Sequence, residues 1–175
     1  SIVVGRSRLS RYRFRHALIR KYLYESLDRV TRPQVHEKIG EVLEVLYGES
    51  RDEYAGQLAY QFQEAALPAK AIQYLFKAGQ RAIRLSANED AIAHLVLAES
   101  MVQKLPQGPE RDSQELSLLM TLMVPLALTR GPAAPEVGQV GDRAHKLLLS
   151  VRETPELAPM LFQVAMYNGL RAEFA

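Results

Sequence analysis

An internal repeat in the middle of the chain constrains its fold more than any other feature. The segment Ala71–Ala78 (AIQYLFKA) recurs as Ala91–Ala98 (AIAHLVLA), with Ala, Ile, Leu and Ala at matching positions. Small residues seven apart lie on one face of a helix and allow a neighbouring helix to approach closely, while the leucine between them fills the space. The repeat therefore predicts successive helices that pack against one another.

The flanking sequence predicts helices along most of the chain. Pro33 suits a first helical turn, with Thr31 or Arg32 as the cap, and Gly48 suits a helix end. Ser86 and Glu89 have the spacing of a capping box that opens another helix. One apolar stripe marks the helix after Pro33: Val35, Ile39, Val42, Leu43 and Leu46. Expected helices cover residues 16–27, 33–47, 52–66, 68–85, 88–105, 110–130 with a kink at Pro125, 137–151, and 155 onward.

Two short segments near the N-terminus have the pattern of strands. Ile2–Val4 is a β-branched run, and Arg11–Arg15 alternates basic and aromatic side chains with the period of a half-buried strand. We expect two strands with a loop between them before the first helix begins at His16. The predicted fold class is therefore all-α with a short N-terminal β-hairpin.

The expected helix over 110–130 is apolar on nearly all of its faces. Its run from Leu116 to Leu128 is interrupted only by Ser117, Thr121 and Pro125. Such a helix is normally buried on several sides. We expect it in the middle of the helical array or at a subunit contact.

The basic and acidic residues are unevenly distributed along the chain. Residues 1–32 hold nine basic and two acidic side chains, a net charge of +7, whereas the remainder carries −5. A basic segment of this kind binds nucleic acid in some proteins and faces an acidic surface or a neighbouring domain in others. Both alternatives remain open. The candidate basic patch comprises Arg11, Arg13, Arg15, Arg20 and Lys21.

The sequence lacks the patterns of the common catalytic and metal sites. It has no cysteine, and the four histidines are widely separated, so thiolate and multi-histidine metal sites are not expected. The glycines form no phosphate-binding loop. No apolar run reaches the ~20 residues of a membrane-spanning helix. We therefore expect no enzyme activity, no metal, no cofactor and no membrane insertion in this segment.

The residues around the first copy of the repeat resemble a tetratricopeptide (TPR) repeat over residues 52–85. Leu58 lies at its usual place, while Ala55, Ala59 and Phe62 stand where that repeat has Trp, Gly and Tyr. With the eight or so helices expected along the chain, the resemblance implies an antiparallel helical array, in which the first helix of each pair lines a concave face. That face would offer a protein or peptide partner four polar and aromatic side chains: Glu53, Tyr60, Gln63 and Glu64.

A second resemblance covers residues 11–105. Phe14, His16, Leu18 and Ile19 are similar to the F-x-F-x-H-x-L-I segment that ends the winged helix of bacterial STAND-class signal-transduction ATPases. Many of these proteins also carry an adenylate/guanylate cyclase-type or kinase domain. The resemblance implies the C-terminal part of a winged helix with a connecting helix over 1–48, and an incomplete TPR-like region over 49–175.

The two resemblances together imply a segment of a longer cytoplasmic protein whose ATP site lies in another module. The expected function is protein–protein interaction or regulation, by scaffolding or sensing for the attached nucleotide-dependent domain. The alternative is a winged-helix segment that binds nucleic acid in an ATP-dependent transcription regulator. A third alternative, part of a catalytic unit, would require nucleotide turnover by the segment alone, which we do not expect.

Overall fold

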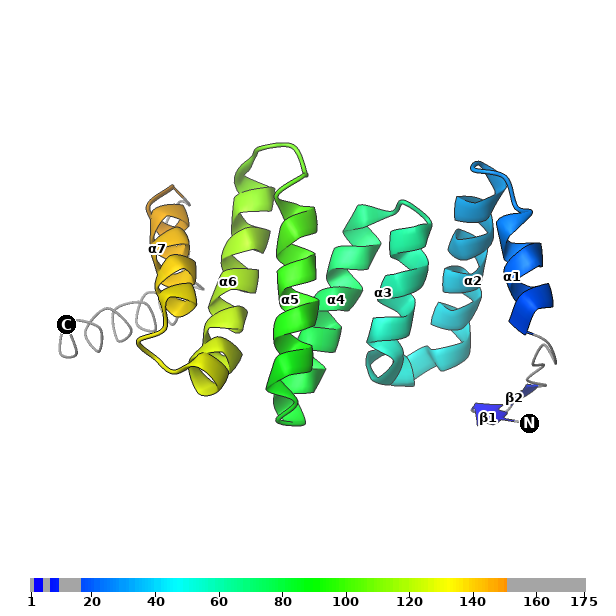
Figure 1. Cartoon of the computed structure of the whole chain (residues 1–175), viewed down its shortest axis with the longest axis horizontal. Coiled ribbons are helices and arrows are strands. Elements are labelled where there is room, and N and C mark those ends of the chain that lie inside the picture. Colours follow the sequence, from blue (N-terminus) through cyan, green and yellow to red (C-terminus); the bar gives the residue numbers. More distant parts are fainter. Residues whose placement is uncertain (1, 5–6, 10–16, 151–175) are drawn as a thin grey trace. The chain divides into compact units, whose positions relative to one another are not determined.

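The computed structural model describes residues 2–4, 7–9 and 17–150, which form strands, helices and short turns (Figure 1). They belong to two compact units, Ser1–Tyr74 and Leu75–Ala175. Apart from one hairpin, every regular element in these described ranges is helical, so the predicted all-α class is confirmed. The elements are β1 (Ile2–Val4), β2 (Ser7–Leu9), α1 (Ala17–Glu25), α2 (Thr31–Tyr47), the 3-10 helix η1 (Gly48–Tyr54), α3 (Ala55–Glu64), α4 (Pro68–Arg84), α5 (Asn88–Val102), α6 (Pro109–Arg130) and α7 (Pro135–Ser150).

The strands β1 and β2 form an antiparallel pair in which Val3 lies opposite Arg8. The first of them coincides with the predicted strand over residues 2–4. The second predicted strand, over 11–15, and the predicted helix from residue 155 onward lie outside the described residues.

The start of α2 is held by an aspartate and not by the predicted cap. The Oδ1 atom of Asp28 accepts hydrogen bonds from the backbone N–H groups of Val30 (2.8 Å) and Thr31 (2.7 Å), and its Oδ2 atom accepts one from the Thr31 hydroxyl (2.8 Å). The bonds from Thr31 are the main reason that the pKa of Asp28 lies below its usual value. Thr31 or Arg32 as the cap was therefore wrong, because the side chain that bonds N–H groups at the start of α2 is that of Asp28, three residues before the helix begins.

The face of α2 that α3 covers is not its apolar stripe. The buried residues of α2 are His36 and Gly40, whereas Val35, Ile39 and Val42 are 38%, 41% and 55% exposed. A Cβ atom on Gly40 would lie 2.8 Å from the Phe62 ring. The absence of a side chain at Gly40 therefore lets the aromatic ring of α3 reach the α2 backbone, and this contact decides which face turns inward.

Two turns of the same geometry precede α4 and α5. Before α4, the Leu67 N–H donates to the Phe62 carbonyl (2.9 Å) and Ala66 has φ 55°. Before α5, the Ala87 N–H donates to the Ala82 carbonyl (2.9 Å) and Ser86 has φ 57°. This pairing is the Schellman ending of a helix. The two turns have the same 20-residue offset as the Ala71 and Ala91 repeat.

The predicted capping box at Ser86 was wrong, because Ser86 belongs to the Schellman turn that ends α4. The residue before α5 is Ala87, which makes no side-chain cap hydrogen bond. Ser86 instead takes the left-handed conformation that closes α4.

Both left-handed positions are occupied by residues other than glycine, which predicts a stabilising substitution. We expect Ala66→Gly and Ser86→Gly each to raise the free energy of unfolding by about 0.5–1 kcal/mol, because the left-handed conformation costs an L-residue about 1–2 kcal/mol and the gain is partly offset by the entropy of an unfolded glycine. Urea denaturation measures the change. The matched control is Ala93→Gly at an exposed position inside α5, which should lower stability by about 1 kcal/mol. Destabilisation by both turn substitutions would contradict the prediction.

The repeat residues form the core where they were predicted to pack. Seven of the eight matching residues are at most 7% exposed, and Ile92 is half-buried. The seven are Ala71, Ile72, Leu75, Ala78, Ala91, Leu95 and Ala98. In the second unit, a Cβ atom on Gly79 would lie 2.7 Å from Cγ of Leu95. The α4 backbone therefore touches the Leu95 side chain directly, as the close approach of small residues predicts.

Helix α6 packs against α5 on one side and α7 on the other (Figure 1). Its burial on several sides is confirmed, since seven of its apolar side chains are at most 6% exposed: Leu116, Leu118, Leu119, Met120, Leu122, Met123 and Leu126. The helix continues through Pro125 to Arg130. Two apolar residues are exceptions to the burial, Val124 at 44% exposed and Leu128 at 70%.

Candidate functional site

The partner-binding residues predicted on the first helix of a pair lie around α3 in the first unit. Glu53, in η1, and Gln63 are exposed, Tyr60 is 51% exposed, and Glu64 is half-buried. Tyr60 and Glu64 adjoin a polar cluster centred on His36, with the Tyr60 ring edge-on to the imidazole at 5.8 Å. These two residues are therefore part of the packing of the unit as well as of its surface.

The His36 cluster joins α1, α2 and α3 by hydrogen bonds. His36 is 6% exposed; its Nδ1 atom lies 2.7 Å from Oε1 of Gln61, and its Nε2 atom lies 3.0 Å from the Tyr24 hydroxyl. With Nδ1–H donating to Gln61, Nε2 accepts from Tyr24. The same hydroxyl lies 3.2 Å from Oε2 of Glu64, so its single proton serves one acceptor at a time. The imidazole therefore has partners on both nitrogens, as a structural histidine requires.

Tyr24 in this cluster is also held from its ring face. The guanidinium carbon of Arg32 lies 4.7 Å from the ring centroid, a cation–π contact. Desolvation is the largest cause of the raised pKa of Tyr24, followed by the negative charge of Glu64. Both effects keep the phenol protonated, so it stays a hydrogen-bond donor.

A second anchor of the first unit is Glu44 on α2. Its carboxylate accepts hydrogen bonds from Nζ of Lys70 (2.8 Å) and from the Tyr74 hydroxyl (2.7 Å) on α4. Burial raises the pKa of Glu44, but these two bonds outweigh it and lower the pKa below its usual value. Burial and the bond to Glu44 raise the pKa of Tyr74 to about 12. The stability contributed by Glu44 is consequently lost as the pH falls through its lowered pKa.

The candidate basic patch lies mostly outside the described part of the chain. Arg11, Arg13 and Arg15 are outside it, and of Arg20 only the place in α1 is described. Lys21 is exposed and lies 3.8 Å from the carboxylate of Glu25. The described residues therefore add no support for a nucleic-acid surface.

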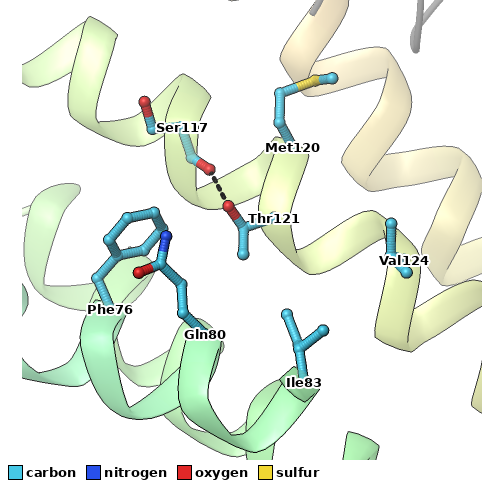
Figure 2. A pocket seen from close by; sticks show the side chains of 7 residues that line it. All are labelled: Phe76, Gln80, Ile83, Ser117, Met120, Thr121 and Val124. Atoms are coloured by element: carbon cyan, nitrogen blue, oxygen red, sulfur yellow. Dashed lines mark hydrogen bonds between the residues drawn. The ribbon is translucent and has the colours of Figure 1, made fainter. Parts of the chain in front are cut away.

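The second unit contains an open groove between α4 and α6. Its volume is about 430 Å³. Phe76, Gln80 and Ile83 rise from α4 toward α6, which forms the opposite wall (Figure 2). That wall consists of Ser117, Met120, Thr121 and Val124. The groove residues recur at intervals of three or four on both helices, so each wall is one helix face.

The groove has few polar atoms to offer. The Thr121 hydroxyl donates to the Ser117 carbonyl at 2.8 Å (Figure 2), which satisfies it within α6. Gln80 is the only amide side chain among the lining residues. The groove contains no carboxylate, imidazole or charged amine among those residues. It is suited to binding apolar side chains and lacks the groups that acid–base catalysis needs.

A buried ionic cluster lies elsewhere in the second unit. Glu115 is 0% exposed, and its carboxylate accepts hydrogen bonds from Nε of Arg143 on α7 (2.7 Å) and from Nη2 of Arg111 (3.3 Å). Burial raises the pKa of the nearby Glu99, and the negative charge of Glu115 raises it further. The cluster joins α5, α6 and α7 and is a packing feature.

The raised pKa of Glu99 predicts a pH-dependent gain from Glu99→Gln. A raised pKa means that the folded state favours the protonated carboxyl, so this group's contribution to stability is present at acid pH and is lost as the pH rises through the folded-state pKa. The glutamine variant should be more stable than the parent near pH 7, by less than about 1 kcal/mol because solvent screens the half-exposed group. Its amide oxygen can still accept the hydrogen bond that Gln103 donates at 3.0 Å.

Urea denaturation at about pH 4 and about pH 7 tests this, since the gain should vanish near the ordinary glutamate pKa. Glu136→Gln, at an exposed position of α7, is the control. A gain of equal size at both pH values would count against the assigned cause.

The sequence did not single out the groove residues. Phe76, Gln80 and Ile83 have helical spacing, but so do the core residues of α4, and apolar periodicity does not separate a core-facing side chain from one that lines a groove. The one available signal was the apolar run of α6, which occupies nearly all faces of that helix.

Among the described residues, no group of three or more histidine, cysteine, aspartate or glutamate side chains is arranged to hold a metal ion. No helix in that part of the chain combines the length and apolar character needed to cross a bilayer. Comparisons of this chain with protein-family models, curated proteins and solved structures find no match.

Proposed function

We propose that this chain is a protein-interaction segment built of degenerate TPR-like repeats. The observation that carries the proposal is the open groove between α4 and α6, whose lining includes an exposed apolar residue, Val124, at 44% exposed. The burial of seven of the eight repeat residues supports the repeat assignment. A groove of this size, mostly apolar and without titratable groups, fits the side chains of a protein partner better than a substrate.

We further propose that the segment belongs to a larger cytoplasmic signal-transduction ATPase of the STAND class, where it scaffolds or senses for the nucleotide-dependent module. The support is the resemblance around Phe14, His16, Leu18 and Ile19, followed by helices. The sequence of the gene upstream of this segment tests the proposal. A phosphate-binding loop there would support it, and a continuous reading frame without one would contradict it.

A selection for binders tests the interaction function. A library of displayed helical peptides is selected against the folded 175-residue chain, and the enriched peptides are titrated against variants. We expect Val124→Glu to weaken binding by at least about tenfold, because it places a charge in an apolar contact. Val96→Glu is the matched control, since Val96 on α5 is 45% exposed and lies outside the groove.

Two results would contradict the proposal. One is the failure of the selection to enrich any peptide, and the other is enrichment of peptides that Val124→Glu and Val96→Glu affect equally. Circular dichroism of both variants shows whether the helices are retained.

A further inference from the structure

From the charge and hydrogen-bonding capacity of the groove, we infer that its partner is an acidic amphipathic helix. The inference rests on the proposed interaction function and adds to it the conformation and the charge of the occupant. Its two parts come from different observations, the lining of the groove and the charges along its rim.

The lining argues for a helical occupant. An extended peptide presents unpaired backbone N–H and C=O groups, each of which needs a partner when it is buried. The groove offers only the Ser117 hydroxyl and the Gln80 amide in return, because the Thr121 hydroxyl is already bonded to the Ser117 carbonyl. A helix satisfies its own backbone and presents an apolar stripe.

The geometry of the walls fits the same conclusion. Phe76, Gln80 and Ile83 extend over two turns of α4, and Ser117, Thr121 and Val124 extend over two turns of α6. A helix laid between two such faces places residues at i, i+4 and i+7 into the space between them. Leu128 continues the α6 face by one more turn and is 70% exposed, so an occupant can extend beyond Val124.

The basic side chains of α4 beside the groove favour an acidic partner. Arg81 and Arg84 lie in the part of α4 that forms the groove, and residues 75–84 contain no acidic side chain. Arg84 directly follows Ile83, so it lies about 100° around the helix from a groove residue, beside the opening. Arg84 is exposed and Arg81 is half-buried. Arg84 takes part in no ion pair within the described residues.

The opposite wall has no charge to counter this preference. Residues 116–129 of α6 contain no charged side chain. Arg130, just beyond them, is held by Glu89 through two hydrogen bonds of 2.8 and 3.0 Å. Arg84 is therefore a positive charge at the groove that no ion pair within the described residues compensates, and carboxylates along one flank of a bound helix would lie beside it.

Two designed peptides test this inference. Both are helices of about 18 residues with the same leucine stripe, and one carries glutamate and the other lysine along both flanks. Fluorescence anisotropy with the folded 175-residue chain should show the acidic peptide binding at least about tenfold more tightly at about 0.05 M NaCl. The difference should shrink at about 0.5 M NaCl, because salt screens exposed charges.

Variants of the chain separate the two parts of the inference. Arg84→Glu should weaken the acidic peptide by at least about fivefold and strengthen the basic one, while Val124→Glu should weaken both. Lys104→Glu, an exposed position at the end of α5, changes the net charge equally and should leave the preference intact.

The other possible results would overturn the charge preference, the helical occupant or the interaction function. Equal or tighter binding of the basic peptide would overturn the charge inference and leave the interaction function standing. Failure of both peptides, while library peptides bind and respond to Val124→Glu, would overturn the acidic-helix occupant alone. Failure of every peptide in both experiments would overturn the interaction function as well.

Discussion

Replacing Glu115 with alanine is expected to lower the free energy of unfolding by about 3–5 kcal/mol, one of the two largest effects of a single substitution that we predict. Glu115 is fully buried and accepts from Arg143 and Arg111. Without the carboxylate, Arg111, whose side chain is only 13% exposed, keeps only its ion pair with Asp112, at 3.3 Å. The cost is mainly that of a largely buried arginine that has lost one of its two carboxylate partners.

Urea or thermal denaturation followed by circular dichroism measures the loss. Glu110→Ala is the control on the same helix, because Glu110 is exposed in its first turn and should contribute only about 0.3–1 kcal/mol through the helix dipole. The double variant Glu115→Met/Arg143→Met should recover part of the loss, since it replaces both members of one pair with apolar side chains. A loss no larger than that of Glu110→Ala would contradict the assigned role.

Leu95→Ala is expected to lower the free energy of unfolding by about 2–5 kcal/mol, because the side chain is fully buried and its removal leaves a cavity. The cavity would lie directly against Gly79, where an added Cβ atom would be 2.7 Å from Cγ of Leu95. Adding Gly79→Ala to Leu95→Ala should therefore restore part of the stability, while Gly79→Ala alone should lower it by about 1–3 kcal/mol through overpacking.

A double-mutant cycle from four denaturation curves measures the coupling between these two positions. Its expected size is about 1–3 kcal/mol, of the sign that makes the double variant more stable than the sum of the single changes. Leu97→Ala is the control on the same helix, because Leu97 is 37% exposed. Additive effects of the two substitutions would mean that Gly79 and Leu95 do not share this space.

Much of the helical fold could be predicted from the sequence because helix ends and small-residue repeats act locally. Gly48 marks the end of α2, as expected, with φ 48°, and the Ala71 and Ala91 repeat occupies the core. The inward face of α2 could not be predicted from its own residues. It depends on the fit of Phe62 against Gly40, two residues on different helices. In the structure, three members of the apolar stripe, Val35, Ile39 and Val42, are exposed, while Leu43 and Leu46 are half-buried.

In the candidate site, too, residues on one helix could be predicted from the sequence, whereas contacts between distant helices could not. The sequence directed attention to Tyr60 and Glu64 on α3, and in the structure these side chains adjoin the His36 cluster. The groove depends on the juxtaposition of α4 with α6, which are separated along the chain by the whole of α5. No local pattern contains that juxtaposition, so Val124 was counted among buried residues of an apolar helix.

The matching turns at Ala66 and Ser86 have a consequence for redesigning the chain. Because the turn and the helix after it recur with a 20-residue offset, the segment from Leu67 to Ser86 is a natural module for duplication. Each added module is one helix, which reverses the direction of the chain. A single insertion would therefore reverse the helices that follow it relative to those that precede it, whereas modules inserted in pairs would preserve the polarity of everything that follows.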